Sequence, residues 1–146
     1  MPAHGDRRSA HVGVDVGPDA DDQRGAPHDD LARDLSIDLK IFVAGRRLDD
    51  NAHVLLRYGN GARGMLWSSQ VAPGNENALR VRIYGEKAGL EWSQEHPNQL
   101  RFAAMGKPPQ TLSRGGPNLG PAAAHATRIP PGHPEGYLEG FANLYR

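Results

Sequence analysis

Apolar and polar residues alternate along residues 50–92 of this chain, and glycine-rich turns interrupt the alternation. A period of two is the spacing of side chains that share one face of a β-strand. The pattern predicts strands at about 52–58, 62–71, 78–84 and 90–92. The connections between them are too short for crossover helices, so we expect neighbouring strands to be antiparallel.

The alternation gives this predicted sheet one apolar face and one polar face. A sheet with such faces is covered by other structure on the apolar side and meets solvent on the other. The polar face carries a group of arginines, namely Arg57, Arg80, Arg82 and Arg101. They fit either a solvated face that limits aggregation or a contact between the sheets of two copies. A nucleic-acid site would need more net positive charge and interleaved aromatic residues.

The flanking segments predict further elements. Residues 39–44 and 100–104 resume strand chemistry, and 111–112 can form a last short pairing. Apolar residues recur at helical spacing in 134–145, where Pro134 suits the first position of a helix. Residues 114–132 between them are irregular. The fold class that we predict is α+β: an open, mainly antiparallel sheet with a C-terminal helix and no Rossmann domain.

The N-terminal segment differs in composition from the rest. Its first 34 residues contain no aromatic residue and no isoleucine, and eight Asp stand against four Arg. The remainder holds nine acidic and thirteen basic residues, so a net charge of −4 and one of +4 cancel in the whole chain. Such a segment buries too little apolar surface to fold. We therefore predict a disordered or aberrant arm at 1–38, with a possible helical turn at 29–35, and a domain at 39–146.

Composition excludes several kinds of chemistry. The 146 residues include no cysteine, so disulfides, thiolate metal sites and a cysteine nucleophile are excluded. The histidines lack metal-ligand spacing, and we expect no metal site. No secretory signal and no apolar run of about 18 residues, the length that a membrane-spanning helix needs, is present. Cysteine usage fits a reducing compartment, and we expect a cytoplasmic protein.

Three short motifs are better explained by local structure. Gly59, Gly61 and Gly64 spell G-x-G-x-x-G, but between two antiparallel strands rather than at the start of a helix, so they predict a hairpin and not a dinucleotide site. Ser68 and Ser69 lie within a strand and lack the turn of a nucleophile elbow. The segment from Arg114 to Gly116 is interpreted as flexible in preference to an anion contact. No catalytic or cofactor-binding residue is predicted in this chain.

Two segments taken together resemble a known family. The strand–turn–strand run that ends in YGEKAGLEW, followed by the helix entry GHPEGY, is similar to the C-terminal domain of Gfo/Idh/MocA-type oxidoreductases, named for glucose–fructose oxidoreductase and inositol dehydrogenase. The resemblance covers about the last two-thirds of the chain. It implies an enzyme whose N-terminal Rossmann domain binds NAD(P) and whose C-terminal α+β domain supplies part of the substrate pocket and often the oligomer interface.

The family's catalytic motifs are not matched here. The resemblance implies a Lys from an EKP-like motif and an Asp and a His from a D-x-G-x-H-like motif. Glu86-Lys87-Ala88 is similar to EKP but belongs to a turn of the sheet, so Lys87 receives no catalytic role. Residues 34–38 stand where the second motif would fall and do not match it. We therefore expect a truncated portion, inactive alone, whose arm is an out-of-frame or wrongly started translation, which the upstream DNA would test.

The function that the resemblance implies is the substrate-binding and oligomerisation domain of an NAD(P)-dependent oxidoreductase acting on a sugar, polyol or related compound. Candidate substrate contacts are Gln70, Arg128 and His133, which lie at a strand end and on the long loop, where sites concentrate. Ordinary exposed polar side chains remain the alternative for each. Two other functions stay open: a non-catalytic module that forms homo-oligomers through its sheet or joins a separate nucleotide-binding partner, and a small-ligand binder using residues 114–132.

Overall fold

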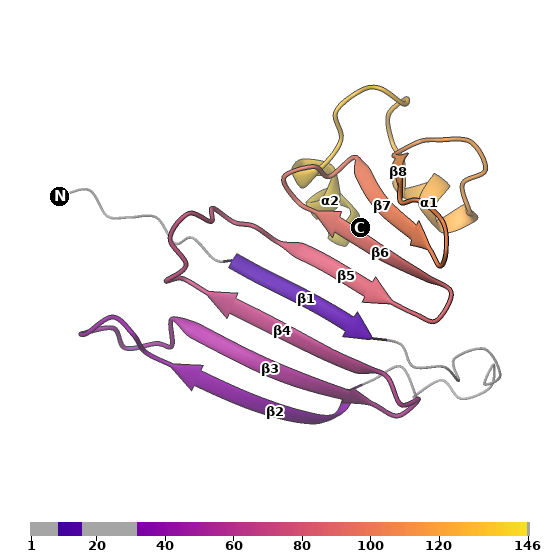
Figure 1. Cartoon of the computed structure of the whole chain (residues 1–146). Helices are drawn as coiled ribbons and strands as arrows, with labels where there is room; N and C mark the ends of the chain where they lie inside the picture. Colours follow the sequence, from indigo (N-terminus) through magenta and orange to yellow (C-terminus); the bar gives the residue numbers. More distant parts are fainter. Residues whose placement is uncertain (1–8, 16–31, 146) are drawn as a thin grey trace.

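The computed structural model describes residues 9–15, as backbone, and residues 32–145. They form one eight-stranded sheet and two short helices (Figure 1). The strands are β1 Ser9–Asp15, β2 Ala32–Lys40, β3 Asn51–Tyr58, β4 Arg63–Ser69, β5 Arg80–Tyr84, β6 Ala88–Ser93, β7 Gln99–Ala104 and β8 Gln110–Ser113. The helices are α1 Pro121–Ala126 and α2 Tyr137–Leu144. The predicted α+β class is confirmed.

The strand order across the sheet is β2-β3-β4-β1-β5-β6-β7-β8. Neighbours are antiparallel except for β1 and β5, which are parallel. The mainly antiparallel sheet was predicted correctly, but the direct pairing of β4 with β5 was wrong. β1 lies between these two strands, which still run in opposite directions (Figure 1).

Two parts of the predicted disordered arm are strands, so that prediction is wrong for them. Ser9–Asp15 is hydrogen-bonded on both sides near the middle of the sheet, where backbone pairing offsets its small apolar content. β2 covers Ala32–Lys40, which replaces both the predicted helical turn and the predicted strand at 39–44, and the predicted domain boundary after Asp38 falls inside it. The rest of the arm, at 1–8 and 16–31, lies outside the described residues.

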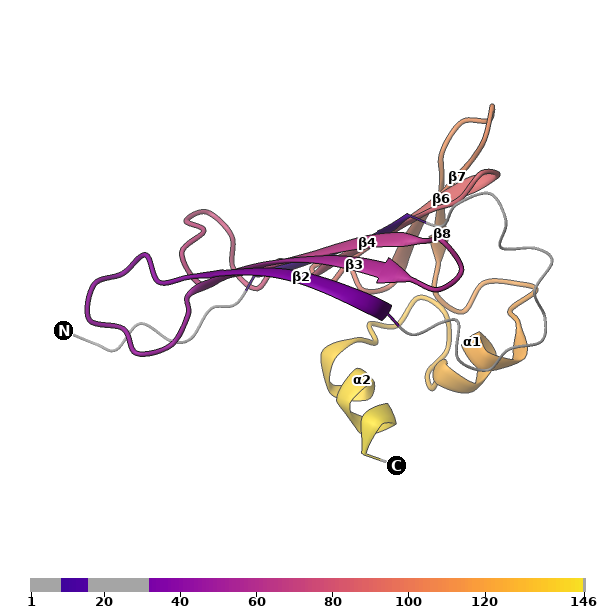
Figure 2. The same cartoon turned by 90° about the horizontal axis from the view of Figure 1, so that it is seen from below.

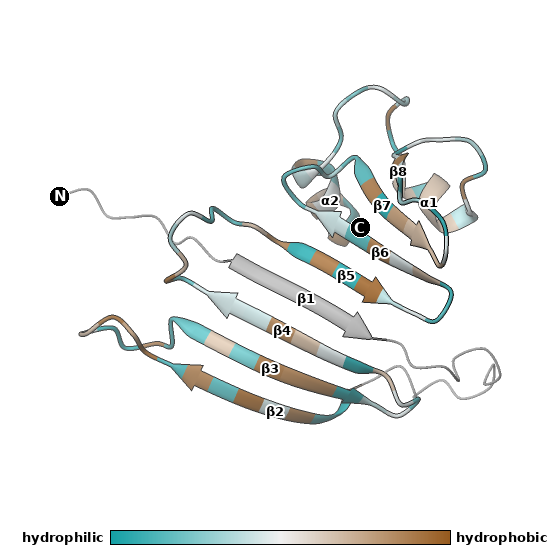
Figure 3. Ribbon diagram, in the orientation of Figure 1, coloured by the Kyte–Doolittle hydropathy of each residue, from teal (hydrophilic) through white to brown (hydrophobic). Residues whose placement is uncertain are grey.

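The register aligns apolar positions across every strand of the sheet. One row of paired residues is entirely apolar: Ile37, Val54, Leu66, Val12, Val81, Trp92, Leu100 and Leu112. The neighbouring positions of each strand face the other way, and the four arginines named above share that polar face. Figure 3 shows the resulting alternation as brown and teal bands along β2, β3, β5 and β7. The predicted division into two faces is confirmed.

Both helices lie on one side of the sheet (Figure 2). That side is the apolar face, because residues of α2 line a cavity together with Trp92. α2 begins at Tyr137, three residues later than predicted, since the side chain of Glu139 accepts a hydrogen bond from the N–H of Gly136 at 2.9 Å and caps the helix there. α1 was not predicted; it interrupts the segment that was expected to be irregular.

The apolar face is only partly covered by the described residues. Leu35, Ile37 and Leu39 of β2 are 52–57% exposed, and Leu138 and Leu144 of α2 are 75% and 77% exposed. Ala62 and Ala78 are the buried hydrophobic residues of the described ranges. A sheet face this apolar requires a covering layer, so the described part of the chain leaves a surface suited to pack against more polypeptide.

Candidate functional site

One end of the sheet collects the connections that carry the candidate residues. β2, β4, β6 and β8 end there, and β3, β5 and β7 begin there, as the antiparallel pairings require. Gln70 follows β4 at this end, and the connection from Arg114 to Gly136, which carries Arg128 and His133, leaves from the end of β8. All three predicted substrate contacts therefore lie at the same end of the sheet.

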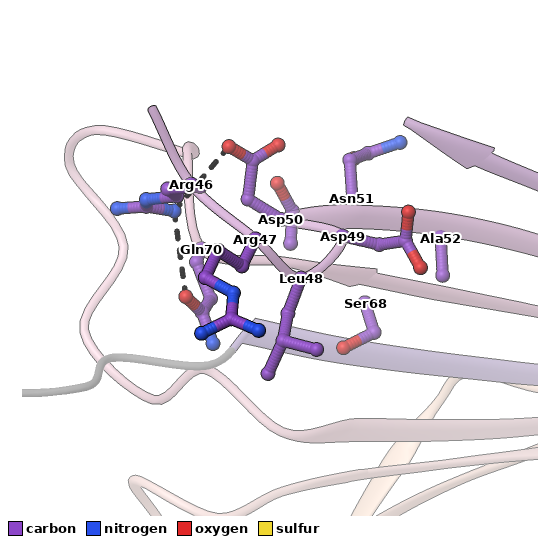
Figure 4. Close-up of a pocket in the computed structure, with 10 residues that line it drawn as sticks. Arg46, Arg47, Leu48, Asp49, Asp50, Asn51, Ala52, Ser68 and Gln70 are labelled. Carbon is purple, nitrogen blue, oxygen red and sulfur yellow. Dashed lines mark hydrogen bonds and ion pairs between the residues drawn. The ribbon is translucent and has the colours of Figure 1, made fainter. Parts of the chain in front are cut away.

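Gln70 lines a cavity of about 530 Å³ between the β2–β3 connection, the start of β3 and the end of β4. Its side-chain oxygen accepts a hydrogen bond from Nη1 of Arg46 at 3.4 Å, and Arg46 also lies 3.4 Å from the Asp50 carboxylate (Figure 4). Arg47 and Asp49 line the same cavity. Two guanidinium groups and two carboxylates leave the lining without net formal charge, and with both donors and acceptors of hydrogen bonds.

Asp50 fixes the β2–β3 connection against this cavity. Its side chain is fully buried, and its two oxygens accept hydrogen bonds from the N–H groups of Phe42 and Val43 at 2.8 and 2.9 Å. Burial acts to raise the pKa of the Asp50 carboxyl, but these hydrogen bonds and the charge of Arg46 outweigh it, and the pKa lies below its ordinary value of 3.8. Asp50 is therefore an ionised acceptor that holds the loop.

Arg114 plays the corresponding part for the long connection. Its Nε donates to the Asn98 side chain at 2.8 Å, and its two terminal nitrogens donate to the carbonyls of Ile129, Pro130 and His133 at 2.9, 3.1 and 2.7 Å. Nη1 also lies 2.6 Å from the Glu135 carboxylate. A guanidinium has five N–H donors, and four of them make these hydrogen bonds. Arg114 therefore contacts an anion, which is the alternative that was set aside for this segment.

Glu135 links the two remaining candidate residues to Arg114. Its side chain is 5% exposed, and Oε1 accepts a hydrogen bond from the N–H of Arg128 at 2.8 Å. Its other oxygen, Oε2, is buried, accepts no hydrogen bond within the described residues and is held by the ion pair with Arg114. The Arg128 side chain reaches Asn143 of α2, and His133 lines a second cavity, of about 380 Å³, with Asn98 and Ser113. Arg128 and His133 are therefore held by one network.

The structure does not bring Gln70 into that network. Gln70 lies at the end of β4, whereas His133 lies beside the start of β7, four strand spacings away. At about 4.8 Å per spacing they are about 19 Å apart. A single small ligand cannot contact both, so the candidates form two groups. Sequence reasoning missed Asp50 and Arg114, which organise these groups; neither has a local sequence signature, because their partners are backbone groups of other segments.

The remaining motifs lie where the sequence placed them. Gly59 and Gly61 belong to the turn between β3 and β4, with Gly61 at a φ of +89°, and Lys87 lies in the turn between β5 and β6. Within 9–15 and 32–145, no group of three or more His, Cys, Asp or Glu side chains is arranged to hold a metal ion. In the same ranges no helix has the length and apolar character needed to cross a membrane.

Comparison with known proteins supplies the class to which this fold belongs. Residues 29–91 match the model of the GFO/IDH/MocA C-terminal domain. An uncharacterized oxidoreductase of Bacillus subtilis (strain 168), YfiI, is 42% identical over 114 residues, which are 77% of this chain and 29% of that protein. The chain therefore belongs to the GFO/IDH/MocA family of oxidoreductases, through their C-terminal domain. It spans less than a third of the length of this curated relative.

Solved structures agree with this assignment. An oxidoreductase from Sinorhizobium meliloti superposes with a TM-score of 0.74 at 43% identity, over 97% of this chain and 44% of that one. An inositol dehydrogenase homolog from Azotobacter vinelandii, complexed with NADH and myo-inositol, superposes with a TM-score of 0.70 at 45% identity, over 76% of this chain and 30% of that one. The chain corresponds to a part of each of these larger proteins.

Proposed function

We propose that this chain supplies the substrate-binding and oligomerisation domain of an NAD(P)-dependent oxidoreductase that acts on a sugar, polyol or related compound, and that it is inactive alone. Hydride transfer requires a nicotinamide held against the substrate. The described residues include no parallel βαβ unit, in which a dinucleotide pyrophosphate is bound at a helix N-terminus. In this proposal NAD(P) is held by a part of the full enzyme that corresponds to none of the described elements.

The similarity to the inositol dehydrogenase homolog that holds NADH and myo-inositol is the observation that carries this proposal. Two features of the structure support it. The uncovered apolar face, with Leu35 and Ile37 of β2 exposed, is suited to receive another domain. The cavity beside Gln70 is lined by paired charges and amides, which match the hydroxyl groups of a neutral polyol in donors and acceptors.

The proposed substrate contacts are Gln70 in the first cavity and Arg128 and His133 in the second network. Because these groups are about 19 Å apart, only one of them is expected to border a small substrate. The group that does not is expected to behave as ordinary polar surface.

A nuclear magnetic resonance titration of the ¹⁵N-labelled chain with myo-inositol tests this division. We expect amide shifts confined to one group, around Gln70 or around Arg128 and His133, and loss of those shifts in Gln70→Ala or His133→Ala respectively. Gln110→Ala, on exposed β8, is the matched control and should leave the titration unchanged. Shifts at neither group, with the fold intact in both variants, would contradict the proposed substrate contacts.

A second candidate function, self-association through the polar face, is favoured by a specific observation. Leu55 and Met65 are opposite each other on this face and are 58% and 52% exposed. Exposed Met and aliphatic side chains beside arginines such as Arg57, which is two residues from Leu55 on β3, are typical of protein interfaces. Leu55→Asp should reduce association in sedimentation equilibrium if this face is an interface; unchanged association in a folded variant would count against it.

A further inference from the structure

The outer edge of β2 is a second surface able to bind protein. β2 is the first strand in the sheet order, and all nine of its residues are exposed, whereas β8 at the opposite edge has four residues. No described strand pairs with the outer side of β2. A long edge strand with apolar side chains is a template for pairing with another chain, and natural proteins cover or blunt such edges.

The direction of the backbone groups of β2 follows from one hydrogen bond. The carbonyl of Lys40 accepts from the N–H of Asp50 at 3.1 Å, so the polar backbone groups of Lys40 face β3. The N–H and C=O groups of successive residues in a strand point to alternate sides. Those of Leu35, Ile37 and Leu39 therefore point to the open edge, while their side chains lie on the apolar face.

We propose that β2 pairs with β2 of a second copy of this chain, antiparallel, with Ile37 opposite Ile37. In this register Leu35 faces Leu39 of the second copy on the apolar face. Asp34 faces Lys40 of the second copy on the polar face, and the two-fold axis repeats that ion pair. The sequence of the strand, ARDLSIDLK, is thus complementary to itself in both hydrophobicity and charge.

The neighbouring two-fold registers are less favourable because of charge. An axis at Ser36 would place Asp34 opposite Asp38, and an axis at Asp38 would place that carboxylate opposite itself. Like charges directly opposite each other destabilise a strand pair. The strand register against β3 is regular from Asp34 to Lys40 and shifts between Ala32 and Asp34, so the proposed pairing spans the regular part.

The pairing extends the sheet of one copy into the sheet of the next. Three hydrogen-bonded pairs, formed by Leu35, Ile37 and Leu39 with their counterparts, would supply about six backbone hydrogen bonds, two per pair. The apolar row that crosses all eight strands would continue into the second copy. This contact uses the strand edge, so it is separate from association through the polar face and does not depend on the proposed enzymatic role.

A single introduced cysteine tests the register directly, because the chain contains no cysteine of its own. In Ile37→Cys the Cα atoms of the two opposed cysteines would lie about 5.5 Å apart. Disulfides usually join residues whose Cα atoms are about 4.4–6.8 Å apart, so the two thiols could form one. Mild oxidation should give covalent dimers much faster than in Met105→Cys, where the replaced side chain is 75% exposed in a turn. Equal rates in the two variants would overturn the proposal.

A charge exchange provides the second test in the otherwise unaltered chain. Asp34→Lys and Lys40→Asp alone place like charges opposite each other and should each raise the dimer dissociation constant roughly tenfold in sedimentation equilibrium. The double variant restores opposite charges and should return the constant to that of the original chain. A double variant that dimerises no better than either single variant would overturn the proposed register. If the dissociation constant is unchanged in these variants but dimers are lost in Leu55→Asp, the dimer forms through the polar face and the proposal is overturned.

Discussion

The β2–β3 connection and the longer connection from Arg114 to Gly136 are held against the same end of the sheet by side chains of opposite charge. Asp50 accepts hydrogen bonds from two backbone N–H groups of the first connection. Arg114 donates to three backbone carbonyls of the second and pairs with a carboxylate from that same segment, Glu135. In the short connection one carboxylate accepts from two adjacent N–H groups. In the long connection a planar guanidinium donates to carbonyls of three different residues.

The comparison explains why each residue type is used. A segment that turns its N–H groups inward requires an anion or another acceptor, whereas a segment that turns its carbonyls inward requires a donor. A guanidinium presents five donors in a fixed plane and so sets the geometry of the carbonyls around it. A lysine at position 114 would supply three donors from a single point. Arg114 therefore fixes its connection at more points than Asp50 does, and its loss should lower the free energy of unfolding more.

The largest expected effect is that of Arg114→Ala. The change leaves the Glu135 carboxylate buried without its partner, and breaking a buried ion pair in this way costs about 3–5 kcal/mol. We expect a corresponding drop in the free energy of unfolding, measured by urea denaturation. Hydrogen exchange should accelerate at the N–H of Arg128, which donates to Glu135, and not at the N–H of Gln70, which donates to the carbonyl of Asp50.

Two controls separate this effect from a general loss of charge. Arg101→Ala removes an exposed pair with Glu91, in which the two groups are 3.9 Å apart, and should cost no more than about 1 kcal/mol. The double variant Arg114→Ala/Glu135→Ala should recover part of the loss, since no buried charge is left unpaired. Equal losses of unfolding free energy for Arg114→Ala and Arg101→Ala would show that Arg114 does not hold the long connection in place.

A smaller effect is expected for Asp50→Asn, and its size depends on pH. Because the pKa of Asp50 is depressed in the folded chain, its ionised form contributes stability above its ordinary pKa of 3.8, and this contribution is lost as the pH falls through the folded value. The urea midpoint of the variant should therefore lie below that of the original chain at pH 7, and the two should converge below pH 4. Asp49→Asn, at the exposed neighbouring residue, should show no such difference.

The smallest effect compares one glycine from each connection. Gly45 and Gly115 have φ angles of +84° and +70°, so an alanine at either position costs about 1–2 kcal/mol from the backbone alone. A Cβ at Gly45 would meet no atom within 4 Å, whereas one at Gly115 would lie 3.0 Å from Cγ of Pro131. Gly115→Ala should therefore lower the thermal midpoint more than Gly45→Ala. Equal shifts of the thermal midpoint would mean that Pro131 can move away from the added Cβ at no cost in stability.

The strands with regular alternation could be predicted from sequence, and those stabilised by their neighbours could not. Val54 and Leu66, or Val81 and Ile83, mark their strands by spacing alone, and the structure confirms them. β1 lies among aspartates and glycines, and its place between β4 and β5 depends on pairing with distant segments. The family resemblance, carried by the sheet turn at Lys87 and the helix entry at His133, was confirmed.

The candidate site was predictable in its location and not in its organisation. Gln70, Arg128 and His133 lie at one end of the sheet, as strand ends and long loops indicate. Their division into two groups follows from the strand order, which inserts β1 between β4 and β5. Asp50 and Arg114 bond mainly to backbone groups, and any residue can supply those groups, so no sequence pattern marks them. The three site residues stay predictions.

A fluorescence titration of this chain with NADH, with and without myo-inositol, most directly tests whether it is the substrate-binding part of a larger enzyme. We predict that the nicotinamide emission stays that of free NADH at millimolar concentrations of the chain, whether or not the polyol is present. Saturable enhancement of that emission at micromolar concentrations would contradict the account, because it would require a nucleotide site within this chain.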